Sequence, residues 1–354
     1  MTASIGRGLV LLSVLFASAG SIVAVAAFLK KRADLTVFAV RAAYGFALSM
    51  FLANAWMVTG LLRNDFSISY VAQVGSIDLP VWVKIVSLWS SLEGSILFWG
   101  GVLAIYVAIG TASLTEAHGW SKPAAIAVWL ACATFFGFLI AGPAQPFGTV
   151  SEVPDDGPGP NPLLQNHVLM AIHPPFLYGG YVGMTLPFGL ALAALITGRL
   201  SPTLLGTLRT SLLAPWSFLT VAIVLGGWWA YEVLGWGGYW AWDPVENASL
   251  LPWLTATAAL HSAILAERRG VLKGWTMILV IASFLLTVLG TFMTRSGIFN
   301  SVHSFTQSAI GPTILVFLGI ATVASLLLLA FRIDLLKPDA ELDGMWTLLA
   351  RADG

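Results

Sequence analysis

The residues best suited to chemistry gather in one stretch, Gly226 to Trp253. It contains six of the fifteen tryptophans in the 354-residue chain: Trp228, Trp229, Trp236, Trp240, Trp242 and Trp253. Glycines between these tryptophans let the backbone turn tightly. Large flat rings on a glycine-jointed loop favour a surface on which a flat, mostly apolar molecule stacks. The alternative is an aromatic belt at a membrane interface, which explains one or two tryptophans at a helix end but not five within fifteen residues.

The same stretch ends in a helix start. Asp243 suits the N-cap position, Pro244 suits the first helical position, and Glu246 lies three residues after the cap. This spacing is typical of a capping box. We therefore interpret Asp243 and Glu246 first as caps and second as ligand contacts.

Two histidines flank the tryptophan-rich stretch. His173 precedes Pro174 and Pro175, and a residue before proline is disfavoured in helical geometry, so we expect His173 just outside a helix that begins at Pro174. His303 lies in the segment that follows the eighth apolar run. Imidazoles are axial ligands of heme iron, and two of them from different helix ends would bracket one iron. For His173, a simple hydrogen-bonding role at a helix end remains the alternative.

Other residues test this heme hypothesis. Arg295 is a candidate partner for a heme propionate because a guanidinium pairs well with a carboxylate, although it could equally anchor a helix end at the interface. Zinc is the runner-up metal, but a closed zinc site needs four ligands, and no third clustered histidine is present. Cys132 is the only cysteine, so thiols for any thiol chemistry must come from another molecule.

The remaining histidines differ in depth. His261 lies thirteen residues into an apolar run, and an ionisable residue at such depth is by default a functional hypothesis. A neutral imidazole bonded to a backbone carbonyl is the alternative. If His261 binds a second heme, the other ligand must come from another chain or another segment. We expect His118 to be solvated in a turn and His167 to lie on the loop surface.

The elements that position these residues are membrane helices. The chain is 58% hydrophobic and 10% charged, against about 25% charged residues in soluble domains. Its net charge of zero gives no indication of a nucleic-acid partner. We predict an all-α integral membrane protein with an external tryptophan-rich loop, a short interfacial helix within 80–91, and about nine spans. Those spans lie near 8–28, 36–61, 92–113, 122–141, 174–197, 211–228, 248–266, 274–293 and 312–332.

Basic residues predict the orientation. Most lie in the connections after the odd-numbered spans, which places those connections in the cytoplasm and the N-terminus and tryptophan loop outside. Arg63 and Arg295 oppose this trend. The first apolar run is long enough for an uncleaved helix. The sequence thus divides into membrane helices and loops over 1–173, a five-span core over 174–333, and a cytoplasmic tail over 334–354. Glu93, at the end of the third span, fits either the interface or the bundle interior.

Three long motifs carry a family resemblance. The tryptophan-rich motif, WWAYEVLGWGGYWAWDPVENASLLPWL, is similar to the "WWD" signature of heme-handling proteins. Two further motifs, NPLLQNHVLMAIHPPFLYGGYVG and GTFMTRSGIFNSVHSF, resemble those of the cytochrome c-type biogenesis family of CcmF and its relative NrfE. Their order matches the family, and the resemblance covers nearly the whole chain. The shorter WWD relatives of the heme exporter subunit CcmC lack this outer pair of motifs.

The resemblance implies the membrane subunit of a heme lyase in the bacterial inner membrane, with a periplasmic N-terminus. Such a subunit receives heme from a periplasmic heme chaperone and promotes its attachment to apocytochrome c, alongside subunits that reduce or hold the apocytochrome. His173 and His303 match the ligands of the incoming heme iron, and the tryptophan loop matches the heme platform. His261 matches one of two membrane histidines that hold a structural heme b. Family members usually extend well beyond residue 354, where the second membrane histidine lies.

The sequence therefore predicts a protein that positions heme for the thiols of a CxxCH motif. No residue resembles a nucleophile, so we assign none as catalytic, and the substrate would supply its own thiols. The alternative function is heme transport or export across the inner membrane. A membrane glycosyltransferase is disfavoured, because Asp155-Asp156 is the only acidic pair in the expected outer segments.

Overall fold

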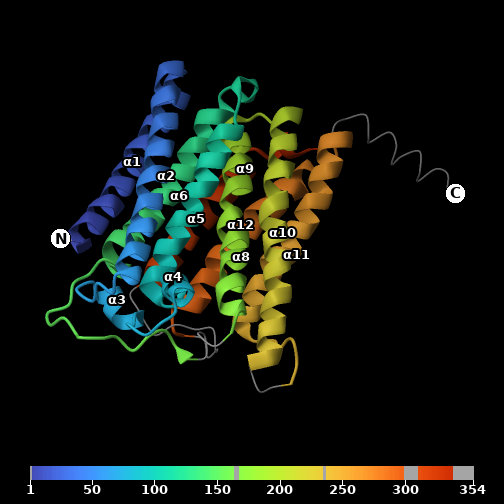
Figure 1. Ribbon diagram of the computed structural model, residues 1–354. Coiled ribbons are helices and arrows are strands. Elements are labelled where there is room, and N and C mark those ends of the chain that lie inside the picture. The colour runs from blue at the N-terminus through green and yellow to red at the C-terminus, as the bar shows by residue number, and fades with distance from the viewer. Residues whose placement is uncertain (1, 163–166, 234–236, 299–309, 338–354) are drawn as a thin grey trace.

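The computed structural model describes residues 2–162, 167–233, 237–298 and 310–337. Within these ranges, nine helical segments are long and apolar enough to cross a membrane, which confirms the predicted all-α membrane fold (Figure 1). They are α1 (Thr2–Lys30), α2 (Ala33–Leu62), α5 (Leu92–Ser113), α6 (Ser121–Leu139) with the π-helix η3 (Ile140–Ala144), α8 (Leu169–Gly183) with α9 (Thr185–Thr197), α10 (Pro202–Val233), α11 (Pro244–Arg269), α12 (Lys273–Arg295) and α13 (Ile310–Phe331).

Short helices complete the described part of the chain. They are α3 (Ser69–Val74), α4 (Val81–Val86) and the 3-10 turns η1 (Ser87–Trp89), η2 (Glu116–His118) and η4 (Ile333–Leu336). The short helix predicted within 80–91 is divided between α4 and η1. Figure 1 shows α3 and α4 at the same end of the bundle as the N-terminal end of α1. The indole of Trp56 donates to the carbonyl of Thr2 at 2.8 Å and ties that end of α1 to α2.

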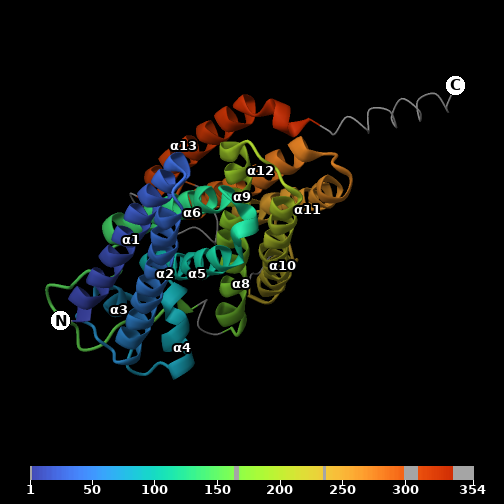
Figure 2. The ribbon, with the colours of Figure 1, turned by 90° about the horizontal axis from the view of Figure 1, so that it is seen from above.

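The segment α8–α9 forms the centre of the bundle. Its most apolar window is 94% buried, whereas that of α13 is only 11% buried. Figure 2 shows α1 and α2 along one side of the molecule and α13 along another, with α9 among α6, α10 and α12. Membrane helices pack closely where small side chains meet, and α1 and α2 bury alanines such as Ala17, Ala24, Ala39 and Ala43.

Helix α8 begins five residues before the predicted start at Pro174, so the placement of His173 outside a helix is wrong. Pro174 has no N–H to donate to the carbonyl of Met170, four residues earlier. The indole Nε1 of Trp89 donates to that carbonyl instead, at 3.1 Å. This contact satisfies the backbone group that the proline leaves without its helical partner, so His173 lies within the first turns of α8.

Helix α10 also extends beyond its predicted range of 211–228. Trp228 and Trp229 therefore lie on the last turns of a helix rather than on a loop. The predicted start of α11 is confirmed. Asp243 accepts from the N–H of Val245 at 2.7 Å, and Glu246 closes the capping box by accepting from the N–H of Asp243 at 3.2 Å.

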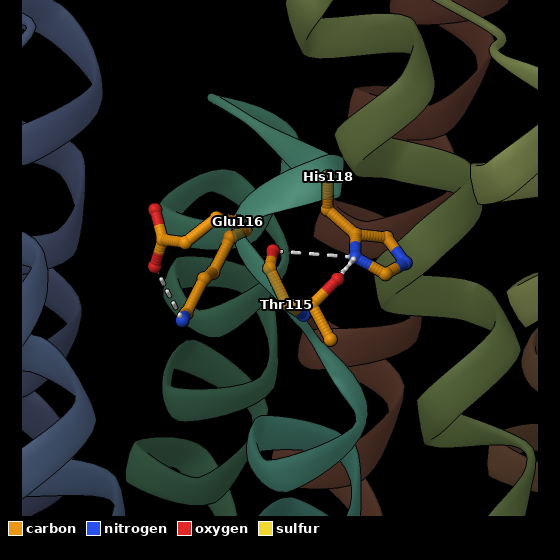
Figure 3. A network of polar contacts seen from close by, with 4 residues as sticks. Thr115, Glu116 and His118 are labelled. Carbon is orange, nitrogen blue, oxygen red and sulfur yellow. Dashed lines mark hydrogen bonds and ion pairs between the residues drawn. The ribbon is translucent and has the colours of Figure 1, made fainter.

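At the opposite end of the bundle, His118 is buried, so the prediction that it is solvated is wrong. Figure 3 shows its ring turned toward Thr115 on the η2 turn. Its Nδ1 accepts from the N–H of Thr115 at 3.1 Å, and its Nε2 contacts the hydroxyl of Thr207 at 2.9 Å. His118 thereby joins the connection between α5 and α6 to α10, and we interpret it as structural.

The segment 142–162, which overlaps the end of η3, is held against α3 and the connection to α4. Asp156 accepts from the N–H groups of Ile77 and Gly157, both at 2.8 Å, and from the hydroxyl of Ser76 at 3.1 Å. These donors, the Ile77 N–H first among them, hold the pKa of the Asp156 carboxyl below its usual range. The interaction fixes one edge of the cavity described below.

Candidate functional site

A cavity of about 570 Å³ lies at the end of the bundle where α5, α8 and α11 begin and where α10 and α12 end. Its volume falls within the roughly 300–1,000 Å³ typical of sites for cofactor-sized molecules. Helix α3, the η1 turn and residues 159–161 close its rim. Its chemically distinctive lining residues are Glu93, Trp99, His173, Tyr178, Trp229, Trp240, Glu246 and Arg295. The structure thus brings together residues of the sequence analysis from five helices, α5, α8, α10, α11 and α12.

His173 is fixed by a backbone contact. Its Nδ1 lies 3.0 Å from the carbonyl oxygen of Ala222 on α10. A carbonyl only accepts, so Nδ1 carries the proton and Nε2 carries the lone pair that binds a metal. Histidines that bind metals typically donate their other ring N–H to such an acceptor. The tautomer of His173 therefore suits an iron ligand.

Two glycines on α10 shape the wall beside His173. A Cβ atom at position 226 would lie 2.9 Å from Cε1 of His173. At position 227 it would lie 3.1 Å from the carbonyl oxygen of Tyr239. Gly226 and Gly227 thus let the imidazole and the segment after α10 approach the helix backbone closely.

The tryptophans of the sequence motif separate into two groups. Trp229 and Trp240 line the cavity. Trp228 and Trp242 are 49% and 70% exposed and do not line it. Trp242 has a positive φ of 59°, which turns the chain sharply just before the cap of α11. Trp236 lies outside the described residues.

Several buried polar atoms on residues that line the cavity have no hydrogen-bond partner among the described residues. They are the indole nitrogens Nε1 of Trp99, Trp229 and Trp240 and the carboxyl oxygen Oε2 of Glu93. Buried polar groups normally have partners, and each exception needs an explanation. Three N–H donors around one cavity fit a ligand that carries acceptors on an otherwise flat, apolar body. Heme, with its two carboxylates, has this chemistry.

Arg295 forms the floor of the cavity and is 4% exposed. Its Nη2 donates to the hydroxyls of Tyr178 at 2.9 Å and Ser95 at 3.2 Å. Its guanidinium carbon lies 5.9 Å from the ring centroid of Trp99, within the range of a cation–π contact. These contacts place a permanent positive charge at the base of the aromatic cavity.

The acidic residues of the motif act as caps. Glu246 lines the cavity, but its Oε2 already accepts from the N–H groups of Ala241 at 2.9 Å and Asp243 at 3.2 Å. Asp243 caps α11 and does not line the cavity. The first interpretation of both residues, as caps, is confirmed.

Sequence reasoning missed the pairing of His167 with Glu232, because 65 residues separate them. His167 Nδ1 accepts from the N–H of Leu169 at 3.1 Å, so Nε2 carries the proton that faces Glu232 at 2.6 Å. Glu232 also accepts from the indole of Trp228. The ring of Trp229 contacts those of both His167 and His173, with centroid distances of 6.4 and 5.8 Å. His167 therefore supports the wall of the cavity.

The other candidates lie elsewhere. His261 is exposed on the surface of α11, and its Nδ1 lies 2.8 Å from the carbonyl oxygen of Thr257. It is seventeen residues, or about 25 Å of helical rise, from the start of that helix. Cys132 is buried in α6. His303 lies outside the described residues.

The fold and the cavity define a class: a multi-pass helical membrane protein with an aromatic, histidine-bearing cavity at one end. A family model described as "Cytochrome C assembly protein" matches residues 89–299, which include this cavity. The chain therefore belongs to that family of cytochrome c-type biogenesis proteins.

Individual relatives agree. Cytochrome c-type biogenesis protein CcmF of Pseudomonas aeruginosa is 42% identical over 301 residues, which make up 84% of this chain and 45% of the relative. NrfE of Haemophilus influenzae is 37% identical over 305 residues, 86% of this chain and 48% of the relative. A solved structure named "Cytochrome c Heme Lyase CcmF" matches with a TM-score of 0.81 and 37% identity, covering 93% of this chain and 51% of that one. The chain spans about half the length of the curated relatives it matches.

Proposed function

We propose that this chain is a membrane subunit of a heme lyase in c-type cytochrome maturation. The observation that carries the proposal is the cavity itself, in which the imidazole of His173 and the indoles of Trp229 and Trp240 surround a space of cofactor size. The family resemblance adds the reaction class. The incoming heme is the substrate, and the attached product is a c-type cytochrome.

In this proposal the residues around the heme have distinct roles. His173 binds the heme iron through Nε2, with His303 as the second axial ligand. Trp229 and Trp240 pack against the macrocycle, and Arg295 binds a propionate. Holding the heme and the CxxCH peptide together lowers the entropic part of the barrier by several kcal/mol. The thiols of the substrate then add to the heme vinyl groups.

The setting of the proposal is the bacterial inner membrane with the cavity on the periplasmic side. The N-terminal end of α1 lies at the cavity end of the bundle, so the N-terminus is periplasmic as well (Figure 1). A periplasmic heme chaperone supplies the heme. Subunits that reduce and hold apocytochrome c supply the peptide.

We also propose a role for His261 in holding a heme b. The described residues supply only one ligand there, since His118, His167 and His173 are engaged elsewhere. Nδ1 of His261 faces a carbonyl oxygen, which leaves the lone pair on Nε2, as a heme ligand requires. When bound, such a heme supplies or accepts an electron. His261 would provide one imidazole to such a heme, and the second ligand would come from another chain or from another segment.

The test is the double variant His173→Ala and His303→Ala in cells that carry the complete maturation system. We expect at least a tenfold loss of covalently heme-stained cytochrome c, and the loss should persist when heme is supplied outside the membrane. His118→Ala is the matched control, because it removes an imidazole at the other end of the bundle. Maturation at wild-type level in the double variant would refute the proposal. Recovery with external heme would favour transport.

A further inference from the structure

Glu93 occupies a place in the cavity that neither iron binding nor ring stacking explains. It lies in the first turn of α5 and lines the cavity. Of the two expected positions for its carboxyl group, the structure therefore has the one that faces the interior of the bundle. Its Oε2 is buried without a hydrogen-bond partner among the described residues. An unsatisfied buried acceptor costs about 1–3 kcal/mol. The side chain as a whole is half-buried and lines the cavity, so a small rotation of the carboxyl group would bring this oxygen to a donor on a bound substrate.

The position of Glu93 is fixed by its neighbours. Arg295 donates to the hydroxyl of Ser95, two residues further along α5, and packs over the ring of Trp99 on the same helix. The carboxyl group thus stands on an anchored helix end, facing the cavity from the α5 side. His173 lines the same cavity from α8, with α10 behind it.

The other titratable groups that line the described cavity are already engaged. Glu246 accepts from two backbone N–H groups as a helix cap. The hydroxyl of Tyr181 donates to a backbone carbonyl, and that of Tyr178 accepts from Arg295. An arginine does not give up its proton in proteins. His173, as an iron ligand, has no proton to exchange at Nε2. Of the two carboxyl groups in the lining, that of Glu246 is committed to the cap through Oε2, whereas that of Glu93 makes no hydrogen bond among the described residues.

Thioether formation needs such a group, because a thiol reacts poorly as a thiol. The thiolate is the nucleophile, and only a few per cent of an ordinary cysteine is thiolate at pH 7. The addition also requires a proton at the terminal carbon of the vinyl group. One group can serve both steps if it takes the proton from the thiol and then gives it to the terminal vinyl carbon.

We propose that Glu93 is the proton-transferring catalytic residue of the heme-attachment reaction. Its carboxylate takes the proton of the substrate thiol and returns it to the terminal vinyl carbon. The sulfur bonds to the vinyl carbon joined to the ring, where the macrocycle delocalises the developing positive charge. One S–H bond and one C=C π bond break, and one C–S and one C–H bond form. No oxidant or reductant is consumed, and Glu93 ends as it began.

This inference rests on the proposed heme-lyase function. A comparison of the wild-type chain with Glu93→Gln tests the role of Glu93 separately from that function. Membranes with the complete maturation system and either wild-type chain or Glu93→Gln receive heme, a reductant and a reduced CxxCH peptide. Glutamine keeps the size and an acceptor oxygen but takes no proton. The measurements are the heme absorption spectrum and the rate of thioether formation from pH 6 to pH 9. Glu116→Gln neutralises an exposed carboxyl at the opposite end of the bundle and is the matched control.

We expect Glu93→Gln to bind heme with an unchanged spectrum and to form the thioether roughly 10²–10⁴-fold more slowly at pH 7, the usual contribution of general acid–base catalysis. The defect should shrink as the pH approaches about 8.5, where cysteine thiols ionise unaided. A defect that is constant across this range, or that accompanies loss of bound heme, would overturn the inference in favour of a structural role. A wild-type rate in Glu93→Gln would overturn it too, while a defective His173→Ala/His303→Ala variant would keep the proposed function intact.

Discussion

The absence of a side chain at position 226 governs how closely His173 approaches α10. Gly226 lies within a helix, where alanine is favoured over glycine by about 1 kcal/mol. The methyl group of an alanine would nevertheless meet Cε1 of His173 at 2.9 Å, a distance that forces one of the two to move. Helix propensity and ligand geometry therefore favour different residues at this position.

Gly226→Ala should consequently weaken heme binding without lowering the stability of the protein. We expect the melting temperature of the purified protein to stay equal or rise slightly, while heme binds roughly tenfold more weakly, about 1.4 kcal/mol. Titration with heme, followed by absorption, measures the affinity. Gly319→Ala on α13 is the control, because a Cβ atom there meets nothing within 4 Å. Equal heme affinity in both variants would show that the imidazole has room to move.

The contact between Trp89 and Met170 makes a second prediction at this scale. Trp89→Phe leaves the Met170 carbonyl without a donor and should destabilise the protein by about 1–3 kcal/mol. Pro174→Ala restores an N–H at the position that normally bonds this carbonyl. In that background the cost of Trp89→Phe should therefore fall. Thermal unfolding in detergent of the four variants of this cycle measures the coupling, and additive effects would contradict the account.

Local patterns predicted some single residues well and others poorly. The caps Asp243 and Glu246 depend on positions three apart, and the structure confirms them. The environment of His173 depends on Trp89, 84 residues earlier in the chain, and on Ala222, 49 residues later. The steric preference of a residue before proline for extended geometry is overridden at His173, and a distant indole satisfies the carbonyl that loses its helical partner at Pro174.

At the scale of elements, the capping box of α11 connects helix formation to the cavity. Glu246 binds the N–H groups of Ala241 and Asp243, and so fixes the turn that presents Trp240. Asp243→Ala should cost about 0.5–2 kcal/mol, as loss of an N-cap usually does. Asp243→Asn keeps an acceptor at this position and should cost less.

Hydrogen exchange at residues 237–247 measures this effect. Asp243→Ala should increase exchange there and leave the middle of α11 unchanged, and heme binding should weaken because Trp240 lines the cavity. Asp243→Asn provides the comparison at equal size. Wild-type exchange in both variants would mean that the Glu246 carboxylate alone fixes the turn.

The Asp156 contacts predict a pH dependence for the segment 142–162. The pKa of Asp156 is lowered in the folded state, so its stabilising effect is complete above the unfolded value of about 3.9 and is lost as pH falls through the folded pKa. We expect limited proteolysis with pepsin to cleave this segment only well below pH 4. Asp156→Asn should allow cleavage by other proteases at neutral pH, whereas Asp155→Asn, next to it and exposed, should not.

Helix boundaries were the least predictable feature of the elements. Hydrophobic length identified all nine spans, but it placed the end of α10 at residue 228 rather than Val233. Trp228, Trp229 and Glu232 continue the helix because Glu232 bonds both His167 and the indole of Trp228. A hydropathy calculation over a sequence window places the end of a span where polar and interfacial residues begin. It contains no information on distant hydrogen-bond partners, such as His167 for Glu232, that extend the helix.

For the whole molecule, the informative surface is the one that carries His261. Its imidazole is exposed on α11 within an apolar part of the helix, two turns after the exposed Leu254 on the same face. A histidine in contact with lipid is unfavourable. A further segment or a second polypeptide that covers this face and supplies another ligand would offset that cost.

The corresponding measurement is a reduced-minus-oxidised absorption spectrum with a pyridine hemochrome assay. The chain purified alone should show little b-type signal, because one imidazole holds heme weakly, and the complete assembly should show a clear one. His261→Ala should abolish the b-type signal of the assembly, while Leu254→Ala, two turns earlier on the same face, should preserve it. A b-type signal that survives His261→Ala but disappears in His173→Ala would place the bound heme in the cavity. The exposed histidine would then need another explanation.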